Sequence, residues 1–119
     1  MRITIVKAEL TRDTEALGSM DVYVKCKWKE DDEDKEWKSE VLDGAGKNPE
    51  WGLEATEGNS FVINVNDLDG TIKFVVKDKD VTTSDEVGYF KTEYCALTFN
   101  NGVNLWFDLV HKNRKAGKV

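Results

Sequence analysis

The stretch "VVKDKDVTTSDEVGYF" at residues 75–90 places a segment rich in carboxylates between two apolar, strand-like ends. Side chains two residues apart in an extended backbone point to the same side, so Asp78 and Asp80 share a face. Two carboxylates about 5 Å apart repel each other by about 3 kcal/mol at an effective dielectric constant of about 20. The spacing therefore favours a divalent hard cation at this position, with an ordinary polar loop as the alternative.

The rest of the chain alternates apolar and polar residues or forms short apolar runs, with almost no helical periodicity. Turn-forming residues separate these runs, a pattern typical of an all-β antiparallel sandwich. The acidic run at residues 30–36 is predicted to be a solvated hairpin tip. One helical turn is expected at "TEYCAL", and the predicted strands are Arg2–Leu10, Tyr23–Trp28, Trp37–Leu42, Ser60–Val65, Thr71–Lys77, Val87–Lys91 and Leu105–Val110.

Length and charge limit the classes of protein and of partner. A chain of 119 residues suits a single domain, 1–119. Its net charge of −6 argues against binding to nucleic acid, and against attraction of the bare protein to an anionic membrane. No segment has the length of a membrane span or the core of a signal peptide, so the expected location is cytoplasmic. Cys26 and Cys95 are expected to be reduced.

No recognised catalytic motif is present, and the protein is predicted not to be an enzyme. The sequence has no nucleophile elbow, no phosphate-binding glycine loop and no histidine placed beside a candidate serine or cysteine. An EF-hand starting at Asp78 would need glycine and glutamate where Thr83 and Tyr89 stand. Zinc fits poorly because the acid-rich loops contain no cysteine. Calcium is therefore the metal that the acidic residues favour.

Three further segments carry a family resemblance when they are taken with residues 75–90. They are "MDVYV" at 20–24, "KNPEWG" at 47–52 and "GVNLWFDLV" at 102–110. Their order and spacing resemble those of the C2 domain family over essentially the whole chain, with Val22 in place of the family's usual proline. The resemblance implies an eight-stranded antiparallel Greek-key β-sandwich of type II topology. The last strand, near "AGKV" at 116–119, is expected to be short and to leave an edge open to a second copy.

The same resemblance implies a calcium cup built from two loops at one end of the sandwich. The first-loop ligand stays open between two acids, and the implied set is Asp21, Asp78, Asp80, Asp85 and either Asp13 or Glu15. Five such acids contribute a charge of about −5, which two calcium ions would reduce to about −1. The expected function is calcium-dependent, reversible binding to anionic phospholipid membranes. The alternative is a calcium-independent C2 module that binds a protein partner or a second copy of itself.

Other residues are candidates for contact with lipid. Leu17 and Val81 are apolar residues at the expected loop tips and are candidates for insertion into a bilayer. Tyr23, Lys25 and Lys38 partly match positions that hold phosphoinositide head groups in some C2 domains, although an ordinary lysine-rich solvent face is the alternative. Trp28, Trp51 and Trp106 are predicted to anchor the core.

Overall fold

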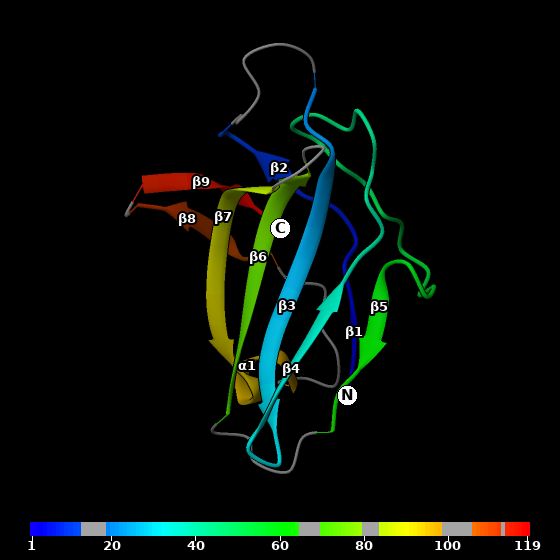
Figure 1. Cartoon of the computed structure of the whole chain (residues 1–119), viewed down its shortest axis with the longest axis vertical. Coiled ribbons are helices and arrows are strands. Elements are labelled where there is room, and N and C mark those ends of the chain that lie inside the picture. The colour runs from blue at the N-terminus through cyan, green and yellow to red at the C-terminus, as the bar shows by residue number, and fades with distance from the viewer. Residues whose placement is uncertain (13–18, 65–69, 80–83, 99–105, 113) are drawn as a thin grey trace.

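The computed structural model of this chain describes residues 1–12, 19–64, 70–79, 84–98, 106–112 and 114–119. Antiparallel strands make up almost all of its regular structure (Figure 1). Among the described residues, no helix is long and apolar enough to cross a membrane. The predicted all-β sandwich is confirmed.

The elements follow the predicted order along the chain, and the helical turn expected at "TEYCAL" is present. They are β1 (Arg2–Thr4), β2 (Glu9–Leu10), β3 (Val22–Glu30), β4 (Glu33–Lys38), β5 (Ser60–Val62), β6 (Thr71–Lys79), β7 (Ser84–Glu93), α1 (Tyr94–Thr98), β8 (Asp108–His111) and β9 (Arg114–Lys118).

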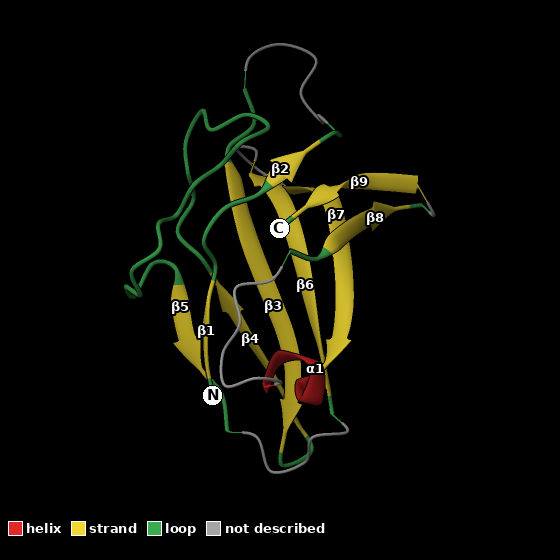
Figure 2. Ribbon diagram, turned by 180° about the vertical axis from the view of Figure 1, so that it is seen from behind, coloured by secondary structure: helices red, strands yellow, loops and turns green. Residues whose placement is uncertain are grey.

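Seven strands form one curled sheet in the order β2-β9-β8-β7-β6-β3-β4, and β1 pairs with β5 in a second sheet. In Figure 1, β8 and β9 lie across the end of the sheet rather than along β6 and β3. Seen from behind in Figure 2, α1 lies at the opposite end of the long strands from β2, β8 and β9. One end of the sandwich therefore carries the helix α1, and the other carries the strands β2, β8 and β9.

The predicted first strand, Arg2–Leu10, is divided between the two sheets. β1 pairs with β5, whereas Glu9 and Leu10 of β2 pair with Lys118 and Gly117 of β9. Counted as one, β1 and β2 bring the described strands to the expected eight. β9 is five residues long and has β8 on one side and β2 on the other, so its edge is covered. This differs from the expected short last strand with an open edge.

The acidic run at 30–36 contains the tip of the β3–β4 hairpin and is largely exposed, as predicted, but most of the run is strand. Only Asp31 and Asp32 form the tip, with positive φ angles of 49° and 63°, as in a two-residue type I′ turn. β4 begins at Glu33, earlier than the strand predicted from Trp37. Charged residues suit an exposed edge strand, and the outward acids Asp34 and Glu36 form ion pairs with Lys29 and Lys25 of β3.

Strict alternation along the central strands separates a core face from an outer face. Val22, Val24 and Cys26 of β3 face the core, as do Phe74 and Val76 of β6, while the residues between them face outward. Of the predicted tryptophan anchors, Trp51 is buried and Trp28 packs half-buried against the core. Trp106 is 43% exposed, so its predicted core position is wrong.

Candidate functional site

Asp21 and Asp78 meet where β3 begins and β6 ends. The backbone N–H of Asp21 donates to Oδ1 of Asp78 at 2.9 Å. The N–H of Lys79 donates to the carbonyl oxygen of Asp21 at 2.8 Å. Asp78 continues the inward-facing row that contains Phe74 and Val76, and its side chain is fully buried. The strand register therefore places a carboxylate at the end of the hydrophobic core.

Asp85 is the direct partner of Asp78 across the β6–β7 pair. Residues directly opposite each other on neighbouring strands share a face, so these two acids lie on the same side of the sheet. Asp85 is exposed, whereas Asp78 is buried. Like charges in this arrangement destabilise each other. The end of the sandwich thus carries a cross-strand acidic pair, with Asp21 beside it.

The turn at residues 43–46 holds the Asp21 side chain. The N–H of Gly44 donates to Oδ1 of Asp21 at 2.7 Å, and the N–H of Gly46 donates to the carbonyl oxygen of Met20 at 3.2 Å. Gly44 has a φ of 66°, a conformation that glycine adopts at little cost. The sequence reasoning did not assign this turn to the site, although "DGAG" at 43–46 was a visible turn signal.

The remaining predicted ligands and loop-tip residues, Asp13, Glu15, Leu17, Asp80 and Val81, lie outside the described residues. Within the described residues, no three acidic, histidine or cysteine side chains are gathered closely enough to hold a metal ion. The oxygen donors of Asp21, Asp78 and Asp85 suit a hard cation such as calcium. These three residues could supply part of such a site, and the other candidate ligands lie outside the described residues.

A second candidate surface is the outer face of β4, β3, β6 and β7, which we call the lysine face. The registers place Tyr23, Lys25 and Lys38 on it. Sequence reasoning left out the neighbours that the sheet brings in from β6 and β7, because pairing between distant strands is not visible in a local pattern. The lysines of this face are Lys25, Lys27, Lys29, Lys38, Lys73, Lys77, Lys79 and Lys91, and its acids are Asp34, Glu36, Glu86 and Glu93.

Several charges on the lysine face already have partners. Lys25 Nζ lies 3.1 Å from Glu36 Oε2, and this hydrogen bond lowers the pKa of the Glu36 carboxyl. Lys73 Nζ lies 4.7 Å from the ring centroid of Tyr89. Tyr23 is only 8% exposed and so offers little surface to a ligand. Lysines nevertheless outnumber acids, which gives this face a positive excess on an acidic protein.

Comparison with models of known protein families identifies the family of this chain. A model of the C2 domain family matches residues 1–109. The chain belongs to the C2 domain family. Members of the family generally act as binding modules rather than as catalysts.

Relatives of this C2 domain include one plant protein. The 16 kDa phloem protein 2 of Arabidopsis thaliana is 30% identical over 86 residues, which cover 72% of this chain and 52% of that protein. The chain therefore spans about half the length of this curated relative.

Solved structures share the fold at low sequence identity. The calcium-bound structure of the two C2 domains of extended-synaptotagmin 2 has a TM-score of 0.74 and 17% identity, covering 99% of this chain and 42% of that one. A structure of CC2D1B has a TM-score of 0.74 and 15% identity, covering 98% of this chain and 50% of that one. These similarities support the C2 sandwich as the fold.

Proposed function

We propose that this C2 domain binds anionic phospholipid membranes in a calcium-dependent manner, through the end of the sandwich where Asp21, Asp78 and Asp85 lie. The observation that carries the proposal is the hydrogen bond from Asp21 to Asp78, which joins residues 57 positions apart. Carboxylate oxygens are the ligands that calcium prefers in proteins. The calcium-bound state of a C2 structure with the same fold adds support.

The electrostatics of this end give a physical reason for binding a cation. Asp78 is buried and stands directly opposite Asp85, so a positive charge beside them would offset their mutual repulsion. Asp80, with either Asp13 or Glu15, would complete the ligand set. Bound calcium would supply positive charge and coordination positions that lipid phosphate oxygens can fill. Without it, a domain of net charge −6 is repelled by an anionic bilayer.

The lysine face is the second proposed contact with lipid. Lys25 and Lys38 are directly paired across β3 and β4, and Lys27 and Lys73 are directly paired across β3 and β6. Such neighbouring ammonium groups suit the clustered phosphates of a phosphoinositide head group. Leu17 and Val81 would add weak insertion into the bilayer. This combination corresponds to a cytoplasmic protein that associates reversibly with a membrane.

A calcium-independent module that binds a protein partner or a second copy is the alternative. The described strand edges give this alternative little support. The edge of β9 is covered by β2, and the edge strand β4 has three acids and two lysines among its six residues. Charged edge strands resist pairing with another chain. The geometry therefore favours membrane binding over self-association through these edges.

Sedimentation with vesicles tests the proposal. The domain is mixed with phosphatidylcholine vesicles containing phosphatidylserine, in calcium or in excess chelator. We expect the wild type to sediment only in calcium, and Asp78→Asn to remain in the supernatant in both. Glu57→Gln is the matched control, because Glu57 is an exposed acid outside both proposed lipid contacts and the charge change is the same. Equal sedimentation of the wild type in chelator would overturn the calcium dependence.

Charge reversal on the lysine face tests the second contact. In vesicles that contain a phosphoinositide, with calcium present, Lys38→Glu and Lys73→Glu should weaken binding several-fold. Lys112→Glu is the control, since Lys112 is exposed in the β8–β9 turn. Equal losses for all three variants would show a general effect of net charge and would remove the lysine face from the proposal.

A further inference from the structure

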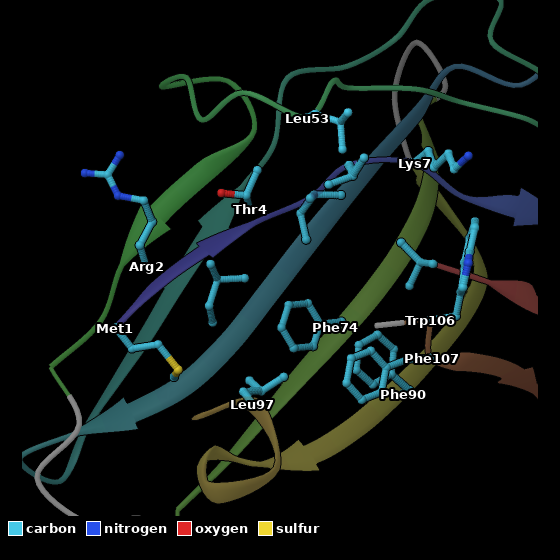
Figure 3. Close-up of a pocket in the computed structure, with 14 residues that line it drawn as sticks. Met1, Arg2, Thr4, Lys7, Leu53, Phe74, Phe90, Leu97, Trp106 and Phe107 are labelled. Carbon is cyan, nitrogen blue, oxygen red and sulfur yellow. The ribbon is translucent and has the colours of Figure 1, made fainter. Parts of the chain in front are cut away.

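A cavity of about 340 Å³ lies between the segment that contains β1 and the inner side of the large sheet (Figure 3). Its volume falls in the range of small-molecule sites, about 300–1,000 Å³. Phe74 of β6 lines it and faces the core, so the cavity is on the opposite side of β6 from the lysine face. Neither proposed membrane contact uses this cavity.

Stacked aromatic rings form one wall of the cavity. The centroids of Phe74 and Phe90 are 4.6 Å apart with an interplanar angle of 8°, and those of Phe90 and Phe107 are 4.6 Å apart at 2°. Ile3 from β1 and Leu97 from α1 also line the space. These stacked phenylalanine rings make this wall of the cavity apolar. Such a surface suits an aliphatic chain.

Exposed apolar side chains also line this cavity. Leu53 is 77% exposed and Trp106 is 43% exposed, and both are lining residues. Among the described residues, the other large hydrophobic side chain with this degree of exposure is Val62, which does not line the cavity. Large apolar groups left in water next to a cavity are typical of a ligand site.

The charges at the cavity select one kind of ligand. Lys7 and Arg2 are its charged lining side chains. The Arg2 guanidinium points away from the phenylalanine rings in Figure 3, whereas Lys7 Nζ lies 5.6 Å from the ring centroid of Trp106. Lys118 Nζ lies 4.5 Å from the same centroid but also forms an ion pair with Glu9 at 3.4 Å. No described carboxylate side chain lies within 4 Å of the Lys7 ammonium, and no aspartate or glutamate lines the cavity. The complementary ligand has an apolar body and one negative charge.

We propose that this cavity binds a free long-chain carboxylate, with the aliphatic chain against the phenylalanine wall and the carboxylate beside Lys7. Trp106 and Leu53 flank the aliphatic chain of the ligand. Binding is independent of calcium, because Asp21 and Asp78 are not part of the cavity. A negative result in vesicle sedimentation would therefore contradict only the proposed calcium-dependent membrane binding. A failure to bind the carboxylate would contradict only the present proposal.

Dodecanoate below its micellar concentration is the probe, with calcium chelated, and calorimetry and the indole N–H resonances of the tryptophans are the measurements. We expect saturable binding that shifts the Trp106 resonance, and a melting temperature that rises with ligand concentration. Dodecyltrimethylammonium, with the same chain and the opposite charge, should bind at least about tenfold more weakly. Equal binding of the two amphiphiles, or no saturable binding of dodecanoate, would overturn the proposal.

Two variants with matched controls locate the site. Lys7→Met keeps the aliphatic stem and removes the charge, and should weaken dodecanoate binding about tenfold. Lys47→Met is its control on an exposed loop. Leu97→Trp should fill the cavity and abolish binding, whereas Val62→Trp should leave binding unchanged. Circular dichroism and ligand-free melting establish that each variant is folded. Equal effects of Lys7→Met and Lys47→Met, or unchanged binding in a folded Leu97→Trp, would place dodecanoate elsewhere.

Discussion

The backbone N–H of Asp21 is hydrogen-bonded to Oδ1 of Asp78 across 2.9 Å, at the end of the core. Asp78 therefore has a structural role, because it satisfies a backbone donor at the start of β3, in addition to its proposed role as a calcium ligand. These roles can be separated, since asparagine keeps an acceptor oxygen but carries no charge.

Asp78→Asn and Asp78→Ala should differ in stability when calcium is chelated. Asp78→Asn keeps the acceptor for Asp21 and removes the repulsion from Asp85, so its free energy of unfolding should be no lower than that of the wild type. Asp78→Ala leaves the N–H without this acceptor and should lose about 1–3 kcal/mol. Urea unfolding measures both. In calcium, only the wild type should gain stability. Equal losses in the two variants would contradict the separation of roles.

Gly88→Ala should destabilise the sandwich by about 1–3 kcal/mol through overpacking. An added Cβ at Gly88 would lie 2.9 Å from Cβ of Ala116 and 3.0 Å from Cβ of Leu109, and both neighbours are fully buried. Denaturant unfolding measures the loss. In a double-mutant cycle, Ala116→Gly should recover part of the stability in the Gly88→Ala background. Strict additivity of the two substitutions would show that the contact does not matter.

The pKa of the Glu36 carboxyl is predicted to lie below its ordinary value of 4.5, because Lys25 donates a hydrogen bond to it and adds positive charge beside it. A lowered pKa in the folded state means that this pair stabilises the fold above the unfolded pKa and stops doing so as the pH falls through the folded pKa. Carboxyl NMR titration of the wild type and of Lys25→Met checks this. The pKa of Glu36 should rise in the variant, and an unchanged value would rule out Lys25 as the main cause.

The thiol of Cys26 should be inert in the folded protein. Cys26 is fully buried on the core face of β3, and burial raises the pKa of its thiol well above the ordinary value. In a Cys95→Ser variant, which leaves Cys26 as the single cysteine, a thiol reagent should react only as the protein unfolds. Labelling in denaturant is the control. Rapid labelling of the folded variant would show that this part of β3 opens readily.

Local pattern was enough to predict the class of fold and much of the site chemistry. Alternation along β3 separated the core face from the lysine face because a strand has a side-chain period of two. The same rule predicted a shared face for Asp78 and Asp80, but the inward direction of Asp78 came only from the structure. The predicted strand ends were less accurate, as at the start of β4. The charges of Asp34 and Glu36 in this strand are balanced by lysines of β3, and this pairing is not visible in the local sequence.

The sequence alone determined that the chain is an antiparallel C2 sandwich with acidic loops, since period, turn residues and motif order are all local properties. Tertiary structure alone decided that Asp85 stands opposite Asp78, that Lys73 lies beside Lys27, and that β2 covers β9. It also decided that Trp106 borders a cavity rather than the core. The reason is physical: strand register and the packing of one sheet on another depend on contacts between residues far apart in the chain, which no local pattern contains.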